Sequence, residues 1–564
     1  MIYSKLGAFQ IRDFIIRKNE VVLLKKDRIN GEKDTTETKK PIAFTSGNIV
    51  TMDPEIDNPE VLIIQNNRIV DVGDKEILKS YDEFELIDLN GQTLMPAFID
   101  AHNHLSFGCL LQKGANLRGI LKKEDVLQKI KNYVLDHPGN GWVIAYPWMD
   151  VHQGGSEFTQ EDLDDLNFDR PILLIHHSFH KSVANSMALK LADIRIATED
   201  PSCGMIVRDE KRNPTGLLIE CAQIPLFELA MESNQETNPT EYANLIEKHA
   251  RELLPFGITA VQDPGVTPRA EAAYRILTNE GRLPVSVLMM PHGEAMLDNQ
   301  GISCLDGPVT GTGDEWLRVG PVKLFADGGV AGSMAFSGEI NGEQYQFGKE
   351  RDDFEDKLIE ATKEGFRVCV HSIGNAATEA VLNSFEKAIQ EAPDGFEIRP
   401  RLEHLFLLSE DQIKRLSSMK GCSAVQACFL EGSQGLKEIH FEGLNWFRFK
   451  DMAEEGVILA GSSDAPGGFM DGRDPIKSAA MGSKMSDNTG NILFPNQGLP
   501  FEKWLWMYTA GAAYAGGLEN ERGMLKKGLV ADMIILEGEL NPEDPPLVVE
   551  TWKNGKKVHS KDKN

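Results

Sequence analysis

The feature that most constrains this chain is a series of short, apolar, strand-like runs that carry or end on a histidine, lysine or aspartate. In Val457-Ile-Leu-Ala-Gly-Ser-Ser-Asp464, a carboxylate follows an apolar stretch. The other positions of this kind are His102, His104, Lys323, His371 and His404. The later ones are about 30–60 residues apart, which is the length of one or two strand–helix repeats. The pattern predicts an α/β fold whose parallel strands end at one polar site.

The chemistry of these residues favours a metal site. His102 and His104 are two residues apart, so in a strand both imidazoles point to the same side and can bind one divalent ion. A lysine inside the apolar run Val322-Lys-Leu-Phe325 is costly unless it is paired or modified. Taken singly, each residue also has an ordinary interpretation, such as an N-cap for Asp464 or a hydrogen-bonded core histidine for His371. All six together, in this order, favour metal binding.

The strand and helix patterns predict a (β/α)8 TIM-like barrel. Its strands are expected at Phe98–His104, Ile258–Asp263, Val285–Met290, Val322–Ala326, Arg367–His371, Arg401–His404, Ser423–Ala427 and Val457–Gly461. Helical spacing of apolar residues is found at Glu241–Leu254, Phe354–Glu364 and Thr378–Ala392. The expected ligands then lie at the carboxyl ends of the strands, where barrel enzymes place their sites.

The remaining parts of the chain predict further units. Residues 41–96 and 520–560 are rich in β patterns, and we expect both chain ends to form one discontinuous β-sandwich beside the barrel of residues 97–519. Residues 105–256, after the first barrel strand, are too long for a plain loop, so we expect a folded insertion over the barrel mouth. Residues 1–40 contain a polar run and are interpreted as an extension or linker.

Two further residues are candidates for substrate binding. His180 is the best candidate in the insertion, where a structural role is the alternative. Asp327 lies four residues after Lys323 and can hydrogen-bond a metal ligand, although a turn role before Gly328 and Gly329 is equally compatible with the sequence.

The chain resembles the amidohydrolase superfamily, and within it the YtcJ-like metal-dependent hydrolases that include the N-substituted formamide deformylases. The resemblance extends from about Ile42 to Val558. It rests on Ile99-Asp-Ala-His-Asn-His104, Val322-Lys-Leu-Phe-Ala-Asp-Gly328, Val370-His-Ser-Ile-Gly374, Arg401-Leu-Glu-His404, Gly461-Ser-Ser-Asp-Ala-Pro466, Phe179-His-Lys-Ser-Val-Ala-Asn-Ser-Met-Ala-Leu189 and Gly528-Leu-Val-Ala-Asp-Met-Ile-Ile-Leu536. As a set these motifs are highly specific.

The resemblance implies a role for each ligand. His102, His104 and Asp464 would hold one divalent ion, with zinc expected, and His371 and His404 a second. Lys323 would be N-carboxylated, and its carbamate would bridge the two ions. Metal-activated hydroxide would attack a carbonyl carbon, with Asp464 as general base and then general acid. The implied activity is hydrolysis of an amide-type, non-peptide C–N bond in a small molecule, as in enzymes of class EC 3.5.

Alternatives within the same superfamily are a deaminase, an isomerase or a lyase that uses the same metal site. Single-metal deaminases of the superfamily typically have a glutamate three residues after the histidine that corresponds to His371. Here that position is Gly374, which cannot move protons and therefore favours amide hydrolysis. Asn375 departs from the aspartate that is usual in the family, which leaves the metal ligands untouched. A non-catalytic binding protein that retains the fold is disfavoured by the complete ligand set.

Composition restricts the partners. A formal net charge of −27 argues against binding to nucleic acid or to an anionic membrane surface. Seven cysteines without close pairing predict reduced thiols, and charges interrupt the apolar residues near the N-terminus where a signal peptide would need an apolar core. We therefore expect a cytoplasmic enzyme whose partner is a small amide. The sequence leaves the oligomeric state open, and a homodimer is common for such folds.

Overall fold

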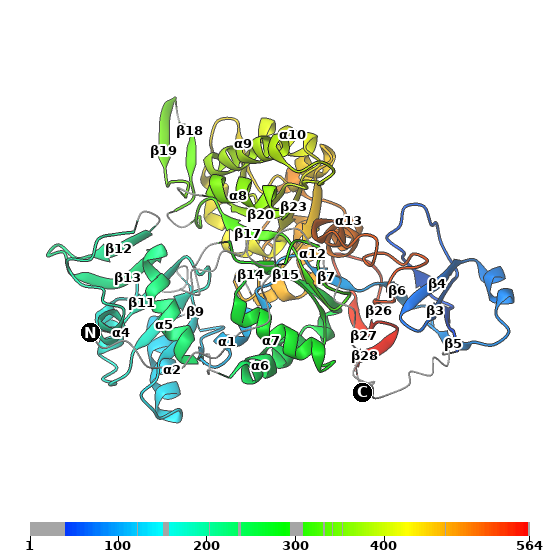
Figure 1. The fold of residues 1–564 in the computed structure, drawn as a ribbon, viewed down its shortest axis with the longest axis horizontal. Coiled ribbons are helices and arrows are strands. Elements are labelled where there is room, and N and C mark those ends of the chain that lie inside the picture. The colour runs from blue at the N-terminus through cyan, green and yellow to red at the C-terminus, as the bar shows by residue number, and fades with distance from the viewer. Residues whose placement is uncertain are drawn as a thin grey trace, which may run out of the picture. The chain divides into compact units, whose positions relative to one another are not determined.

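The computed structural model describes residues 40–120, 122–149, 157–201, 204–234, 238–293, 308–330, 333–340, 342–351, 354–467 and 470–561. The expected N-terminal extension, residues 1–40, lies outside the described residues except for Lys40. The described chain contains two parallel sheets with their helices. It also contains a mixed sheet in the insertion, and mixed sheets formed by strands β1–β6 (residues 42–96) and β26–β28 (residues 533–560) (Figure 1).

Parallel strands form two sheets, in the orders β16-β15-β14-β7 and β17-β20-β21-β23-β25. Their bounds are β7 Phe98–Asp100, β14 Ile258–Val266, β15 Ser286–Pro291, β16 Leu317–Val319, β17 Val322–Phe325, β20 Val368–Ser372, β21 Arg401–His404, β23 Cys422–Val425 and β25 Ile458–Gly461. Each of the eight expected strands is present, and β16 is a further short strand. Their side chains are almost all buried, which explains why parallel strands read as continuous apolar runs.

The two parallel sheets contact each other at both edges. His292, just after β15, forms a parallel bridge with Lys323 of β17. At the other edge, the backbone N–H of Ala101 donates to the carbonyl of Gly461, at 3.2 Å, and links the ends of β7 and β25. The α/β fold is therefore confirmed. The closed eight-stranded barrel stays a prediction, which these two links support.

Helices follow the parallel strands and bury their apolar faces. Their bounds are α6 Pro239–Arg251, α7 Pro268–Asn279, α8 Phe354–Lys363, α9 Asn375–Glu391, α10 Glu410–Ser418, α11 Phe449–Glu454, α12 Pro475–Lys484, α13 Phe501–Trp506 and α14 Ala512–Gly516. The three expected helices correspond to α6, α8 and α9, with ends shifted by up to three residues. Local signals fix their starts: Thr267 caps α7 before Pro268, and Ser409 with Gln412 forms a capping box on α10.

The insertion has a sheet of its own, in the order β12-β13-β11-β10-β9-β8. The bounds of its elements are α1 Leu105–Leu111, β8 Ala115–Asn116, α2 Lys123–Asp136, β9 Val143–Trp148, α3 Gln160–Asp164, β10 Ile172–His176, β11 Lys181–Ala184, α4 Ser186–Leu191, β12 Gly204–Arg208, β13 Pro214–Glu220 and α5 Ile224–Asn234. One face of this sheet packs a separate apolar core that includes Val126, Ile130, Trp148 and Leu174. The insertion is thus a folded unit and not a long loop.

Strands from both ends of the described chain share a second β region. The sheets have the orders β4-β3-β1-β5 and β2-β6-β26-β27-β28. Their bounds are β1 Ile42–Thr45, β2 Asn48–Ile49, β3 Val61–Gln65, β4 Arg68–Gly73, β5 Glu85–Asp88, β6 Thr93–Pro96, β26 Met533–Glu537, β27 Leu547–Lys553 and β28 Lys556–Ser560. Antiparallel pairing of β6 with β26 joins the two ends, and Phe44 packs edge-to-face on Trp552 at 5.3 Å between ring centroids.

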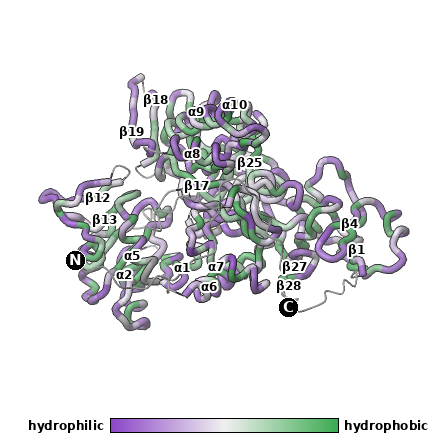
Figure 2. The backbone as a smooth tube through the Cα atoms, viewed as in Figure 1, coloured by the Kyte–Doolittle hydropathy of each residue, from purple (hydrophilic) through white to green (hydrophobic). Residues whose placement is uncertain are grey.

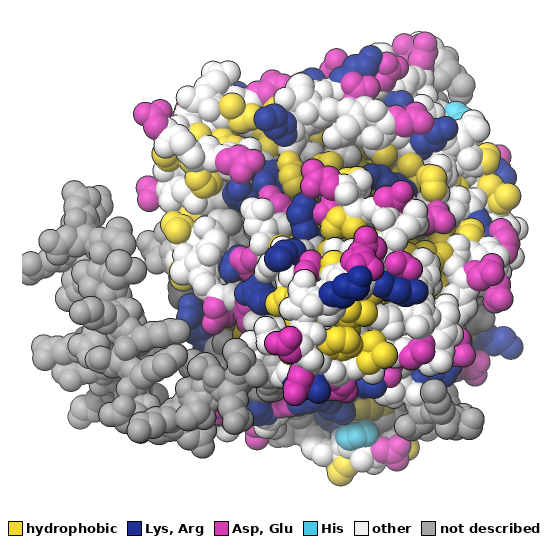
Figure 3. All heavy atoms as spheres, turned by 90° about the vertical axis from the view of Figure 1, so that its right-hand side faces the viewer, with side chains coloured by type: hydrophobic (Ala, Val, Ile, Leu, Met, Phe, Trp, Pro, Cys, Tyr) yellow, Lys and Arg dark blue, Asp and Glu magenta, His cyan; other side chains and the backbone are white. Residues whose placement is uncertain are grey.

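Two small antiparallel pairs complete the fold, β18 (Phe336–Ile340) with β19 (Glu343–Phe347) and β22 (Leu407–Ser409) with β24 (Leu444–Trp446). The tube of the β18–β19 hairpin is coloured mainly hydrophilic, in contrast to the hydrophobic β25 (Figure 2). On the face shown in Figure 3, acidic side chains are interspersed with Lys and Arg. None of the helices in the described part of the chain combines the length and apolarity that a membrane crossing requires.

The cysteines agree with the sequence expectation at four positions and not at a fifth. Cys109, Cys369, Cys422 and Cys428 are free and buried. Cys221 is disulfide-bonded, so the expectation of reduced thiols is wrong for this residue. Folding can bring cysteines that are distant in sequence within bonding range, and spacing along the chain does not reveal this.

Candidate metal centre

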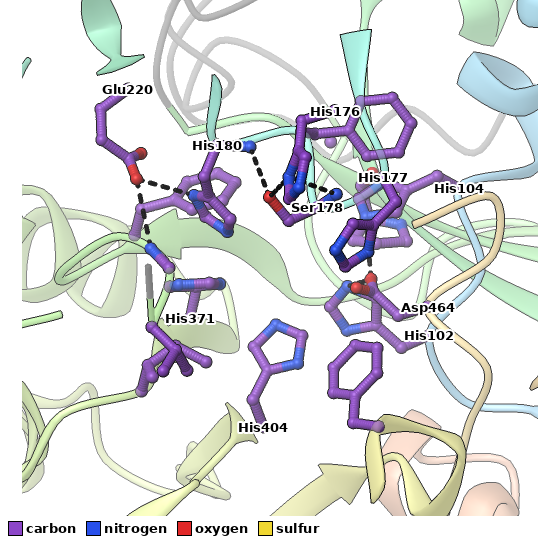
Figure 4. Close-up of a pocket in the computed structure, with 18 of the residues that line it drawn as sticks. His102, His104, His176, His177, Ser178, His180, Glu220, His371, His404 and Asp464 are labelled. Carbon is purple, nitrogen blue, oxygen red and sulfur yellow. Dashed lines mark hydrogen bonds and ion pairs between the residues drawn. The ribbon is translucent and has the colours of Figure 1, made fainter. Parts of the chain in front are cut away.

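One cavity of about 350 Å³ is lined by all six residues expected to bind metal. Figure 4 labels His102, His104, His371, His404 and Asp464 among them. Each comes from the carboxyl end of a parallel strand, or, for Lys323, from within β17. The histidines His102 and His104 follow β7, His371 lies in β20, and His404 ends β21, whereas Asp464 comes three residues after β25. Residues separated by more than 300 positions in sequence therefore face one space.

The atoms expected to bind metal lie close together. Asp464 Oδ1 is 3.1 Å from His102 Nε2 and 3.2 Å from His104 Nε2. The potential ligand atoms of His102, His404 and Asp464 all lie within 4.8 Å of one another. The ring centroid of His371 is 4.7 Å from that of His404, so His404 lies between the two expected ligand groups. Neither His102 Nε2 nor His371 Nε2, although buried, has a hydrogen-bond partner among the described residues, which is what a metal ligand needs.

The other ring nitrogen of three histidines is held by an acceptor. His102 Nδ1 contacts Glu403 Oε2 at 2.5 Å, and His104 Nδ1 contacts the carbonyl of Pro264 at 3.0 Å. His404 Nδ1 contacts Gln426 Oε1 at 2.9 Å. With the proton on Nδ1 in each ring, Nε2 is left with a free electron pair toward the cavity. Such supporting contacts orient histidines at metal sites.

Glu403 is itself held in place by Arg401. The Arg401 Nε donates to Glu403 Oε1 at 2.6 Å, and a second guanidinium nitrogen donates to the carbonyl of Ala101 at 2.6 Å. Burial alone would raise the pKa of Glu403, but Arg401 and His102 outweigh it and hold this pKa well below its usual range. The carboxylate that orients His102 is therefore ionised.

The pKa values of the ligands match metal binding. Burial lowers the pKa of His404 to about 3 and that of His371 well below its usual value, so both imidazoles are neutral near pH 7. Burial would raise the pKa of Asp464, but the neighbouring imidazoles of His102 and His104 outweigh it and hold that pKa well below its usual range. Neutral imidazoles and an ionised carboxylate are the forms that bind a divalent ion.

Lys323 is buried, and no carboxylate of the described residues forms an ion pair with it. Its side chain is 1% exposed, and its Nζ lies 4.9 Å from the ring centroid of Phe325. No hydrogen bond or ion pair within 4 Å joins its Nζ to another described residue, and the carboxylates of Glu403 and Asp464 act on it only at longer range. Burial lowers its pKa, which favours the neutral amine.

The backbone is strained at several cavity positions. His404, Asp464, Phe179 and Glu220 have φ values of 77°, 56°, 63° and 50°, which side chains other than glycine rarely adopt. Such conformations cost about 1–3 kcal/mol each and persist where the surrounding structure holds them for a purpose. All four residues line the cavity.

The two expected substrate-binding residues lie in different places. His180 lines the cavity, whereas Asp327 is fully buried and is not among the lining residues. Asp327 accepts backbone hydrogen bonds from Ala335, Ile373 and Gly374 at 2.8–3.0 Å, and burial raises its pKa to about 7. It ties the loop after β17 to the loop after β20. Its Oδ1 lies 3.8 Å from His371 Nε2.

Several residues of the site were missed by the sequence analysis. They are Arg401, Glu403, Gln426, Glu220 and Arg351. Arg401 and Glu403 are two residues apart in one strand, so their side chains lie on the same face. Because a buried strand accommodates charged side chains only as pairs, this spacing could have predicted the ion pair. No comparable sequence pattern near Glu220 or Arg351 could have predicted their place in the cavity.

The cavity walls beyond the ligands are mainly apolar. Phe107 packs on Phe179 with ring centroids 5.1 Å apart, and Phe227 extends this wall. Phe406 and Phe429, 5.4 Å apart, form another aromatic wall next to His404. The arrangement combines a compact polar centre with room for apolar groups.

Comparisons with known proteins agree on one family. A model of the amidohydrolase family matches residues 85–559. The chain is 29% identical to the amidohydrolase-family protein YtcJ of Bacillus subtilis, over 88% of this chain and 94% of that one. It is 26% identical to the N-substituted formamide deformylase of Arthrobacter pascens, over 88% of this chain and 93% of that one. An uncharacterized metal-dependent hydrolase from Pyrococcus horikoshii superposes with a TM-score of 0.68 at 25% identity, covering 92% of this chain and 100% of that one.

Proposed function

Because the chain belongs to the amidohydrolase family and is YtcJ-like, we propose that it hydrolyses an amide-type, non-peptide C–N bond of a small molecule with a divalent metal. The observation that carries the proposal is the pair of buried imidazole nitrogens, on His102 and His371, that have no hydrogen-bond partner among the described residues. They lie in one cavity with the ionised Asp464. A metal centre satisfies these atoms, whereas an empty structural core would leave them at a cost.

The proposed ligand set is that of the sequence analysis. His102, His104 and Asp464 would hold one ion, and His371 and His404 a second, with Lys323 between them as an N-carboxylated ligand. Zinc is the expected ion because imidazole and carboxylate ligands suit it. When bound, the metal supplies a Lewis acid for the carbonyl oxygen and lowers the pKa of water.

The protein residues would move one proton from water to the amine. Asp464 accepts a proton from the attacking water, whose oxygen bonds to the carbonyl carbon. As the C–N bond breaks, Asp464 returns that proton to the leaving nitrogen, so a carboxylic acid and an amine are formed. Glu403 and Gln426 hold the rings of His102 and His404 in orientation throughout.

The aromatic walls would exclude water and hold an apolar substituent of the amide. His180 would contact the substrate, and Asp327 would act by holding the two loops beside it. The relative from Arthrobacter pascens is a deformylase of N-substituted formamides, so these amides are the first class to screen.

A deaminase with a glutamate at position 374 is disfavoured by the structure around that residue. A Cβ atom on Gly374 would lie 2.0 Å from the carbonyl oxygen of Ala335, which leaves no room for a side chain. The absence of a side chain at this position supports amide hydrolysis over ring deamination.

The test is metal content per chain, measured for the wild type and for Lys323→Ala after growth without chelators, together with release of amine from N-substituted formamides. We expect about two divalent ions in the wild type, fewer in the variant, and amine release that chelators abolish. Release of ammonia, or an isomerised product, from the same metal-loaded protein would overturn the proposal in favour of the other superfamily chemistries.

A further inference from the structure

A buried glutamate from the insertion holds His180 at the metal centre. His180 Nδ1 lies 2.9 Å from Glu220 Oε1. Figure 4 shows the His180 ring between Glu220 and His371, with one nitrogen toward Glu220 and the other toward the cavity. The ring centroids of His180 and His371 are 5.5 Å apart. A group that fixed His180 would therefore act within reach of a substrate at the metal.

The fold of the insertion brings the two residues together. His180 precedes β11 and Glu220 ends β13, and these strands are antiparallel neighbours with Lys181 opposite Ile219. The backbone N–H of Glu220 donates to the carbonyl of His180 at 2.8 Å. The pair thus lies at adjacent strand ends of the insertion sheet, where it faces His371 of the parallel strand β20.

Glu220 is anchored on several sides. It is 5% exposed and accepts hydrogen bonds from the backbone N–H of Gly329, at 3.2 Å, and from the Ser333 hydroxyl. An Arg351 nitrogen lies 3.8 Å from its other oxygen. Its φ of 50° is a conformation that costs about 1–3 kcal/mol for a residue with a side chain. A position chosen only for the turn would favour glycine, so the carboxylate itself is required here.

Two adjacent glycines leave the space that this pair occupies. A Cβ atom on Gly329 would lie 2.5 Å from Cδ2 of His180, and one on Gly328 would lie 2.3 Å from Glu220 Oε1. Neither glycine has a φ in the left-handed region, so the space and not the backbone conformation requires them. The loop after β17 therefore packs directly against His180 and Glu220 at these two glycines.

We propose that Glu220 is a positioning residue that, with Gly328 and Gly329 packed against it and His180, fixes the His180 ring so that Nε2 faces the substrate oxygen at the metal centre. The role of His180 as a substrate contact rests on the proposed function. Although Glu220 also lines the cavity, the proposed role is exerted through His180 and not by contact with the substrate.

The experiment is a double-mutant cycle on the metal-loaded enzyme with two probes. The first is affinity for acetohydroxamate, which places oxygen atoms on a metal and needs no turnover. The second is hydrolysis of formanilide, an N-substituted formamide. We expect His180→Ala and Glu220→Ala each to weaken acetohydroxamate binding by about 10-fold, which corresponds to one hydrogen bond to a charged group. The double variant should bind no more weakly than either single variant.

Two further variants separate positioning from folding. Glu220→Gln keeps an oxygen that can accept from His180 Nδ1, so it should retain most of the affinity that Glu220→Ala loses. Gly329→Ala pushes on the His180 ring and should weaken binding as His180→Ala does, with unchanged metal content. The matched control is Glu252→Ala, which removes a glutamate 3.2 Å from His249 Nδ1 and outside the cavity, and should change nothing.

The outcomes distinguish the two proposals. If Glu220→Ala weakens binding equally in the wild-type and His180→Ala backgrounds, Glu220 acts through Gly329 and Ser333 and the positioning role is overturned. If the acetohydroxamate cycle shows coupling but formanilide and other amides are not hydrolysed, the positioning role stands and the proposed hydrolase function fails. Coupling in both probes supports both.

Discussion

Two buried lysines lie at opposite ends of the same parallel strands, and they are held in different ways. Lys553 ends β27 and contacts Ser286, where β15 begins, whereas Lys323 forms a bridge with His292, just after β15 ends. Both are almost fully buried, and both have their Nζ 4.9 Å from an aromatic ring centroid. Of the two, only Lys553 forms an ion pair with a carboxylate of the described residues, its Nζ lying 2.8 Å from Asp532 Oδ2.

The end with Lys553 is built as a paired structural contact. Asp532 also accepts hydrogen bonds from the Arg522 guanidinium, at 3.1 Å, and from the backbone N–H of Asn554, at 2.7 Å. Burial would raise the pKa of Asp532, but Lys553 and Arg522 outweigh it and lower that pKa. These contacts join the sheet of the chain ends to the parallel strands. Lys553, which serves folding, is therefore paired. Lys323 forms no ion pair with the described residues, so its burial calls for a different explanation.

The largest expected effect is at the metal end. Asp464→Asn should lower the turnover of a formamide substrate by up to about 10⁴-fold, because the neutral amide cannot accept the proton of water. Metal content, measured by elemental analysis, should be nearly unchanged. Full turnover in this variant would remove Asp464 from the proton transfer. Asp451→Asn, which removes a carboxylate paired with Arg448 outside the cavity, is the control.

Lys323→Met tests whether this lysine serves the metal and not the fold. We expect loss of bound metal and a fall in turnover of at least about 100-fold, since a ligand is removed. The unfolding free energy of the metal-free protein, measured with urea, should stay the same or rise, because an unpaired buried amine is replaced by an apolar side chain. A stability loss without loss of metal would make Lys323 a structural residue like Lys553.

Asp532→Asn tests whether the Lys553 ion pair serves the fold and not the metal. It leaves Lys553 and Arg522 buried without a carboxylate, so the unfolding free energy should fall by about 3 kcal/mol. Metal content and turnover of the folded fraction should be unchanged. A loss of metal at unchanged stability would show that the two ends are not separate in role.

Glu403→Gln should have a smaller effect, confined to metal affinity. Removing the charged acceptor of His102 Nδ1 should weaken metal binding by about 10–100-fold, as measured by competition with a chelator. Unaltered affinity would show that Arg401 and the strand alone orient His102.

The smallest expected effect is a pH dependence of stability. Burial lowers the pKa of Lys553 from 10.5 to about 8, and Asp532 offsets only part of this shift. Between these two pH values the unfolded chain holds more protons than the folded protein, so the unfolding free energy contributed by this group should rise with pH. Urea midpoints from pH 8 to 10 should rise for the wild type relative to Lys553→Met. A fall would mean that the lysine keeps its proton when folded.

Much of the site was predictable because its signals are local. Each ligand follows or lies within a short apolar run, and all eight runs are strands in the structure. His102 and His104 share one side because of their spacing, and the glycine at position 374 was visible in the sequence. The eight strand positions, and the six residues that line the cavity, could thus be predicted from patterns of fewer than ten residues, whereas the metal-binding role of the six stays a prediction.

The sequence by itself determined which residues are available to bind metal and on which strands they lie, because neighbouring residues set strand periodicity and burial. Tertiary structure alone decided which partner holds each of them. Glu403 reaches His102 across 301 positions, and Glu220 reaches His180 only because β11 and β13 pair in the insertion. The same holds for the difference between the two lysines, since a counter-ion is supplied by whichever distant segment packs against the amine, and no local pattern records that packing.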